Sequence, residues 1–278
     1  MFKGRTLLIA TKHEKEKVIA PILEKELGVK CVVSSDFDTD TLGTFAGEVE
    51  RTLDPLGTAR QKCVHALSDT TYDLAIASEG SFGPHPTFFF SYADDEILLL
   101  VDTLNDIEIV VRFLTTETNF NAMNVTSRKS LMEFAKATRF PSHALILKRS
   151  KDDFQDMKKG ITNWETLHAH FLFLMEKYQT AYVETDMRAM LNPSRMNFIE
   201  KVAEKLTAKI KTTCAVCNTP GFGITVVVEG LPCELCNLPT GSTLSYIYSC
   251  QKCDFTKEEK YPNGKTKENP MYCDVCNP

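Results

Sequence analysis

Residues 73–86 read DLAIASEGSFGPHP, and this stretch changes character in the middle. Residues 74–77 form a short apolar run typical of a buried strand, and a polar segment with two glycines follows at once. We expect the strand to end there, with Glu79 at its tip beside Gly80. A carboxylate in that place belongs either to an exposed loop or to a functional site.

The segments before this stretch predict an α/β domain. Residues 6–10 (TLLIA) are typical of a buried strand, and apolar residues at helical spacing follow over 18–27, where Pro21 should cause a kink or an irregular first turn. Residues 31–34 predict a second strand. Asp54 and Pro55 then form a favourable helix start, with Asp as the N-cap and Pro at the first helical position.

The segments after it predict an antiparallel meander. Three β segments follow in series over 87–92, 96–103 and 107–116, with turns at 93–95 and 105–106. A helix near 127–138, a strand at 143–148 and a helix around 163–179 come next. The fold class is therefore α/β, with a mixed twisted sheet and flanking helices.

A second unusual strand begins at residue 181, in AYVETDMRAMLNPSRM. Alternation would place Glu184, Asp186 and Arg188 on one face, which is costly inside a protein unless the charges are paired or used. Asn192 and Pro193 then open a last helix, whose exposed N–H groups can hold an anion. The pattern fits either a self-satisfied Asp186–Arg188 network with an Asn cap, or a binding site.

Eight of the ten cysteines lie in the last 65 residues, always in C-x-x-C pairs. The pairs are Cys214/Cys217, Cys233/Cys236, Cys250/Cys253 and Cys273/Cys276. In a reducing compartment this pattern favours metal over disulfides, and eight thiolates make two closed structural zinc sites. The spacing favours consecutive pairing, as in successive zinc ribbons, although interleaved or nested pairing stays open.

Composition divides the chain into a domain over residues 1–211 and a small ribbon-like zinc module over 212–278. The net charge of −5 gives no reason to expect a polyanionic partner. From residue 211 onward there are six lysines and seven acidic residues, and each four-thiolate zinc site adds about two negative charges, so nucleic-acid binding is disfavoured. No apolar run suggests a membrane span or a signal peptide, and we expect a cytoplasmic protein.

The first 120 residues resemble the inosine/xanthosine triphosphate pyrophosphatases and their Maf-like relatives. The resemblance is carried by IATKHEKEK after the first strand, by DPLGTARQKCVHAL, and by YDLAIASEGSFG before a hairpin. In that family a lysine after the first strand meets the triphosphate, and Lys15 is the best match. Lys62 matches a basic helix residue, and Glu79 matches the carboxylate that binds metal or activates water. As a whole, the chain resembles a bacterial domain family of unknown function that ends in four C-x-x-C pairs.

The resemblance implies a nucleotide-binding or pyrophosphohydrolase-like protein that uses Mg²⁺. Lysines would offset the triphosphate charge, Arg188 and Arg195 would clamp phosphate oxygens, and Asp186 would be a second metal ligand. Asn192 would contribute at the start of the last helix. The alternative is a non-catalytic protein that recruits a protein partner, or a second copy of itself, through its zinc module; a nucleic-acid-binding ribbon protein is a weaker alternative.

Overall fold

The computed structural model describes residues 1–34, 52–68, 70–88 and 90–278. The chain forms two compact units, Met1–Thr207 and Ala208–Pro278. Within the described residues the fold is mixed α/β, as predicted, with three sheets and five α-helices. None of the helices described combines the length and the apolar character that a bilayer crossing requires.

The main sheet of the first unit has the strand order β2-β1-β3-β4-β5. Strands β2, β1 and β3 are parallel, whereas β4 and β5 continue from β3 as an antiparallel meander. The strands are β1 (Thr6–Ala10), β2 (Lys30–Val33), β3 (Leu74–Pro84), β4 (Tyr92–Asp102) and β5 (Ile107–Thr115).

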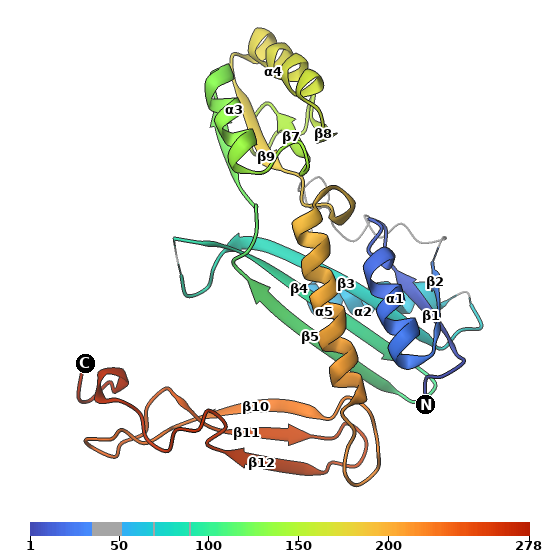
Figure 1. Ribbon diagram of the computed structural model, residues 1–278, viewed down its shortest axis with the longest axis vertical. Coiled ribbons are helices and arrows are strands. Elements are labelled where there is room, and N and C mark those ends of the chain that lie inside the picture. Colours follow the sequence, from blue (N-terminus) through green and yellow to red (C-terminus); the bar gives the residue numbers. More distant parts are fainter. Residues whose placement is uncertain (35–51, 69, 89) are drawn as a thin grey trace. The chain divides into compact units, whose positions relative to one another are not determined.

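Helices cover both faces of this sheet (Figure 1). Helix α2 (Pro55–Ser68) packs Ala59, Cys63 and Ala66 against one face. Helices α1 (Glu16–Leu27) and α5 (Pro193–Lys211) lie over the other face. Because side chains alternate along a strand, neighbouring residues of β3 point to different helices.

Two predictions about helices α1 and α2 can be compared with the structure. The Asp54 carboxylate accepts a hydrogen bond from the Gly57 backbone N–H at 2.6 Å, so the predicted cap of α2 is confirmed. Helix α1 contains Pro21 and continues through it to Leu27.

Two predictions around β3 are wrong. The strand does not end at Glu79, because β3 and β4 pair continuously from Leu74↔Asp102 to Pro84↔Tyr92. Residues 93–95 therefore lie inside β4 and form no turn. Of the strand predicted over 87–92, residues 87, 88, 90 and 91 are loop instead, and residue 89 lies outside the described residues. Pairing to β1 stops at Ala77, so Glu79 sits just past the parallel part of the sheet.

A smaller sheet of the first unit has the order β6-β9-β7-β8, with helices α3 (Arg128–Ala137) and α4 (Trp164–Tyr178). Its strands are β6 (Ala122–Val125), β7 (Leu145–Lys148), β8 (Lys158–Ile161) and β9 (Ala181–Thr185). Because β9 ends at Thr185, the predicted strand alternation does not extend to Asp186 and Arg188. A short 3-10 helix (η2, Ala189–Leu191) connects this region to α5.

The second unit is an antiparallel sheet with the order β10-β11-β12. The strands are β10 (Gly223–Glu229), β11 (Thr243–Ser249) and β12 (Thr256–Lys260), and a 3-10 helix (η3, Pro270–Tyr272) follows. Most side chains of β10 and all of β12 are exposed, so this sheet has very little apolar core of its own.

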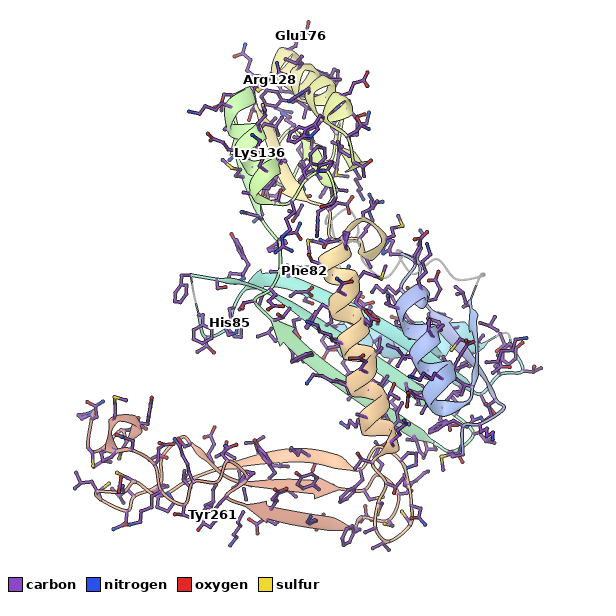
Figure 2. All side chains as sticks on the ribbon, viewed as in Figure 1. Phe82, His85, Arg128, Lys136, Glu176 and Tyr261 are labelled. Carbon is purple, nitrogen blue, oxygen red and sulfur yellow. The ribbon has the colours of Figure 1, made fainter. Side chains whose placement is uncertain are left out.

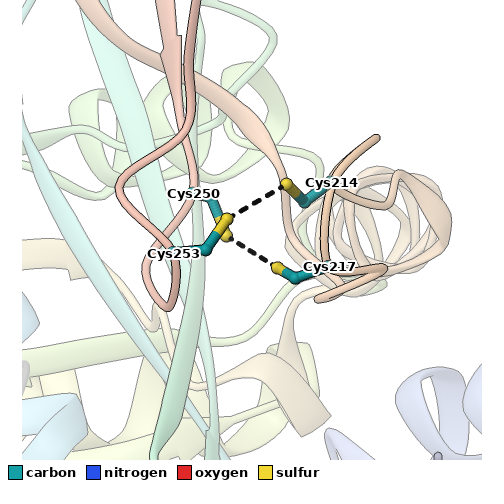
Figure 3. A group of neighbouring side chains, drawn as sticks. All are labelled: Cys214, Cys217, Cys250 and Cys253. Carbon is teal, nitrogen blue, oxygen red and sulfur yellow. Dashed lines mark hydrogen bonds between the residues drawn. The ribbon is translucent and has the colours of Figure 1, made fainter.

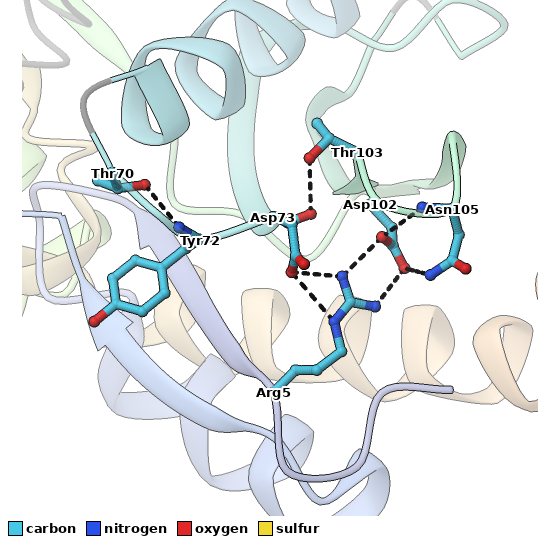
Figure 4. Close-up of polar contacts among 7 residues, drawn as sticks. All are labelled: Arg5, Thr70, Tyr72, Asp73, Asp102, Thr103 and Asn105. Carbon is cyan, nitrogen blue, oxygen red and sulfur yellow. Dashed lines mark hydrogen bonds and ion pairs between the residues drawn. The ribbon is translucent and has the colours of Figure 1, made fainter.

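An arginine joins three strand ends at the edge of the main sheet opposite the carboxyl end of β1 (Figure 4). The Arg5 guanidinium donates to Asp73 at 2.7 Å and to both oxygens of Asp102 at 2.7 and 2.8 Å. Asn105 also donates to Asp102, which is fully buried. Burial opposes ionisation of Asp102, but the hydrogen bonds from Arg5 and Asn105 outweigh it and lower the pKa of Asp102.

Replacing Arg5 by Met should lower the free energy of unfolding by about 3 kcal/mol, because it leaves the Asp102 carboxylate buried without its cation. The pKa of Asp102 is lowered in the folded state, so this contribution should be present above about pH 4 and be lost as the pH falls further. Urea denaturation at pH 7 and pH 3 measures both. The exposed Arg60–Glu108 pair provides a control, since Arg60→Met should cost at most about 1 kcal/mol. Equal losses for the two variants would contradict this account.

Candidate functional site

Charged side chains gather where β1 ends beside β3. The carboxyl ends of parallel strands are the common ligand-binding edge of α/β sheets. Lys15 follows β1, Lys62 comes from α2, Glu79 and Gly80 lie on β3, and Glu96 on β4; Arg195 opens α5. Lys15, Glu79, Glu96 and Arg195 are each at most 5% exposed. Sequence analysis selected four members of this group, namely Lys15, Lys62, Glu79 and Arg195.

On the face covered by α2, Glu79 forms an ion pair with Lys62 through its Oε1 atom. The side chains are 5% and 12% exposed. The pair continues the column of Ala75 and Ala77 on β3, which packs against α2. The carboxylate and the ammonium group therefore lie at one end of the apolar interface between β3 and α2.

On the opposite face, Lys15 donates to the Ser78 hydroxyl at 2.9 Å, and Arg195 donates through Nε to Glu96 at 2.6 Å. Arg195 also donates to the carbonyl of Met187, and its guanidinium lies 5.0 Å from the ring centre of Phe82. Phe82 is labelled on β3 in Figure 2. Through these contacts Arg195 connects α5 to the sheet.

Gly80 makes this bridge possible. A Cβ atom on Gly80 would lie 2.5 Å from Glu96 Oε1 and would also collide with Arg195. Gly83, three residues later on the same strand, has open space at that position. Of the two glycines that the sequence places around Glu79, only Gly80 is needed for close approach.

Burial changes the protonation of two groups here. Burial, followed by the positive charge of Arg195, lowers the pKa of Lys15 to about 7. Glu96 and Glu79 raise this pKa and Lys62 lowers it, so the other four charged groups all act on Lys15. Burial and then the charge of Glu96 raise the pKa of Asp94 to about 8. At neutral pH Asp94 is therefore mainly protonated, and Lys15 is divided between its two forms.

Asp186 and Arg188 form a separate, local network. Asp186 is 1% exposed and accepts hydrogen bonds from Arg188 Nε at 2.9 Å and from the Gly160 backbone at 3.0 Å. Asn192 caps α5 by accepting from the Arg195 N–H at 3.1 Å, and it donates to Asn119 at 2.8 Å. These contacts match the self-satisfied network and Asn cap, one of the two alternatives open from the sequence.

Sequence reasoning missed Asp94 and Glu96. The sequence predicts a turn at residues 93–95 and a strand from residue 96, whereas both residues lie on β4, two positions apart, and share the face that α5 covers. Within the described residues, Asp94 Oδ1 and Glu96 Oε2 have no hydrogen-bond partner. The available signal was alternation: acidic residues at 94 and 96 lead directly into the buried run ILLLV.

The cysteines of the second unit form two groups, each of which can hold a metal ion. Figure 3 shows the first group. Its members are Cys214, Cys217, Cys250 and Cys253, and those of the second are Cys233, Cys236, Cys273 and Cys276. Neighbouring sulfurs lie 3.5–3.8 Å apart. Four thiolates at about 2.3 Å around one ion are separated by about 3.8 Å, so both groups fit a tetrahedral site.

Consecutive pairing, which the spacing favoured, is wrong, because the first pair meets the third and the second meets the fourth. The meander explains this. Gly223 at the start of β10 pairs with Ser249 at the end of β11, which brings the flanking pairs 214/217 and 250/253 together. Ser245 near the start of β11 pairs with Lys260 at the end of β12, so the remaining pairs meet at the other end.

In three of the four C-x-x-C turns, the residue after the second cysteine has a left-handed backbone conformation. Asn218, Asn237 and Asp254 directly follow the second cysteine of their pairs and have positive φ values of 58°, 60° and 54°. Asn and Asp are the side-chain-bearing residues that adopt this left-handed conformation most readily. Backbone N–H groups of Val216, Leu235 and Lys252 each donate to the sulfur of the first cysteine of their pair at 3.4 Å.

Carboxylates do not form a comparable centre. In the part of the chain that the structure describes, the two cysteine groups are the only sets of three or more side chains placed to share a metal ion. A divalent ion at Glu79 would therefore need further oxygen ligands from a substrate or from water.

Metal content of double variants tests the interleaved pairing. Cys214→Ser with Cys253→Ser removes two ligands from one group and should leave one bound metal ion per chain. Cys214→Ser with Cys233→Ser removes one ligand from each group and should weaken both. Elemental analysis after dialysis against a chelator measures the ratio. The opposite order of metal loss between the two variants would support consecutive pairing.

The comparisons with known proteins assign most of the chain to one family and leave the first 61 residues unassigned. No curated protein and no solved structure matches the chain. Residues 62–278 match a family described as Domain of unknown function (DUF6671), and the match begins at Lys62 within α2 and includes all eight paired cysteines. The chain belongs to this DUF6671 family.

Proposed function

We propose that the first unit binds a phosphorylated small molecule of the nucleotide class at the carboxyl ends of β1 and β3. The observation that carries this proposal is the buried group of Lys15, Lys62 and Glu79, together with Glu96 and Arg195. Burying charge is costly, and buried ion pairs often contribute less than apolar packing would. Ionisable groups with shifted pKa values, such as Lys15, cluster at functional sites, and these groups lie at the carboxyl ends of parallel strands.

Each of these groups has a role in the proposal. Lys15 and Lys62 offset the negative charge of the phosphates, while Glu79 holds a Mg²⁺ ion that arrives with the ligand, or orients a water molecule. When bound, Mg²⁺ neutralises phosphate oxygens and orients them for attack. Arg195 and Gly80 hold the start of α5 against this edge of the sheet. Hydrolysis of a nucleoside triphosphate to a monophosphate and pyrophosphate is the reaction that this set of groups supports best.

We propose that both cysteine groups bind zinc and act structurally. Four thiolates close the coordination sphere, which leaves no position for a catalytic water. The exposed strands β10 and β12 supply little apolar burial, so metal binding would provide much of the folding free energy of this unit.

A second candidate function is protein contact through the zinc unit. Val226 and Val227 on β10 are 52% and 53% exposed, so apolar side chains emerge on both faces of an edge strand. Exposed apolar edges are typical of strands that pair with another chain. Concentration-dependent self-association without any nucleotide binding would favour this candidate.

Calorimetric titration with a panel of nucleoside triphosphates and Mg²⁺ tests the first proposal. Because the pKa of Lys15 is about 7 and a bound anion stabilises its protonated form, binding at pH 8 should take up a proton. Affinity should therefore fall as the pH rises from 7 to 9. Lys15→Met should weaken binding and abolish proton uptake, which is measured by comparing buffers of different ionisation enthalpy.

Turnover is tested on Glu79→Gln by detection of pyrophosphate and phosphate. This variant should retain the fold and lose activity by about 100-fold or more, as expected for a group that acts on the attacking water. Glu108→Gln is a matched control, because Glu108 also pairs with a basic residue of α2, Arg60, but does so at the surface. No binding and no turnover with any triphosphate would overturn the proposal.

A further inference from the structure

A pocket of about 430 Å³ lies in the first unit, and neither Glu79 nor Lys62 lines it. It is lined by the end of β5, the turn after α3 and the first turns of α5. The lining side chains that matter here are Thr115, Thr118, Arg139, Ser194, Asn197 and Lys201.

Ser194 sits in this pocket beside a buried histidine. Its Oγ atom lies 2.9 Å from His143 Nε2, and its backbone N–H donates to the same nitrogen at 3.3 Å. His143 is 5% exposed. Burial, and then the charge of Arg139, lowers its pKa. His143 is therefore neutral at neutral pH.

The hydrogen-bond directions fix which atom carries each proton. Because a backbone N–H donates to Nε2, this nitrogen is the acceptor and the proton resides on Nδ1. Arg139 can only donate, and it does so to Ser194 Oγ at 2.7 Å. The Ser194 hydroxyl proton is thereby directed at His143 Nε2.

A further serine orients the histidine. Ser142 Oγ lies 3.0 Å from His143 Nδ1 and donates to the Arg139 carbonyl at 2.7 Å, so it accepts the Nδ1 proton. The chain of bonds runs from Arg139 to Ser194 to His143 to Ser142. A hydroxyl, a neutral base and a group that orients the base are the elements of nucleophilic serine catalysis.

We propose that Ser194 is a nucleophile, that His143 is its general base, and that the pocket accepts a small carboxylic ester carrying a negative charge. Ser194 Oγ would form a bond to the ester carbonyl carbon while its proton passes to His143. The bond from that carbon to the alcohol oxygen would break, and the alcohol would leave with the proton from His143. Water would then hydrolyse the acyl-serine, with His143 again accepting and returning a proton.

The basic side chains define the substrate class. Helix N–H groups are already used, since the Ser194 N–H bonds to His143 and the Arg195 N–H bonds to Asn192. Stabilisation of the oxyanion therefore falls to Arg139, which already contacts Ser194 Oγ. Lys201 lies two turns further along α5 in the same pocket, where its exposed ammonium is 4.0 Å from the exposed Glu117 carboxylate. A carboxylate or phosphate on the substrate would replace Glu117 as the partner of Lys201.

The test uses the full chain with diisopropyl fluorophosphate, in which a bond from phosphorus to Ser194 replaces the phosphorus–fluorine bond and fluoride and a proton are released. Peptide mapping by mass spectrometry should find one adduct per chain, on Ser194. His143→Gln should slow labelling by about 100-fold or more, and Ser194→Ala should abolish it. Ser142→Ala should slow labelling less, because Ser142 acts only by orienting His143.

Ser127→Ala is a matched control, since Ser127 is also a serine at a helix start and caps α3 through a bond from the Ser130 N–H. It should lose stability and keep the labelling rate of Ser194. The network could instead serve only to fasten the turn after α3 to α5. In that case the wild-type chain, shown to be folded by circular dichroism, carries no adduct on Ser194, and this result overturns the proposal without requiring any variant to fold.

Discussion

The buried ion pair of Arg195 and Glu96 is the contact on which the first unit depends. Arg195 is among the largest fully buried side chains, and its guanidinium bridges α5 to β4 while crossing β3 at Gly80. An unpaired charge in this position would cost several kcal/mol, so the two residues must be kept together. Pairing with Glu96 fixes the position of Arg195 and with it the start of α5, because the Arg195 N–H also donates to the capping residue Asn192. It also fixes the edge of the sheet at which Lys15 and the Lys62–Glu79 pair lie.

The second unit has very little apolar core, and its two cysteine groups are placed to supply the missing constraint through metal coordination. Its three strands carry pairs of cysteines at their ends, and the up-and-down order of the strands decides which pairs meet. A strand of seven residues spans about 23 Å, which is too long for pairs at its two ends to share one ion. Two cysteine groups, one at each end, are therefore placed so that bound metal ions would clamp the sheet. The same strands leave apolar side chains exposed on β10, the feature that favours protein contact.

Local sequence signals predicted most elements, because strands such as β1 and helices such as α2 are defined by apolar spacing and caps within a few residues. The failures came from long-range pairing. Nothing local shows that β3 continues past Gly80, since its partner Glu96 lies sixteen residues later and the stabilising Arg195 lies about a hundred residues further. The prediction of which cysteine pairs meet failed for the same reason, because the order of the strands, and not the spacing of the pairs, decides it. The pair of Ser194 and His143 is not recognisable from the sequence, because the two residues are 51 positions apart and meet only when α5 packs beside the turn at Arg139.

A double-mutant cycle on Arg195 and Glu96 tests most directly whether this pair holds the first unit together. Urea denaturation of Arg195→Met, Glu96→Gln and the double variant gives the coupling free energy. Each single variant should lose about 3–5 kcal/mol, and the double variant should lose markedly less than their sum, because neither side chain is then left as a buried unpaired charge. Additive losses, or single losses below about 1 kcal/mol, would show that the pair does not carry this role.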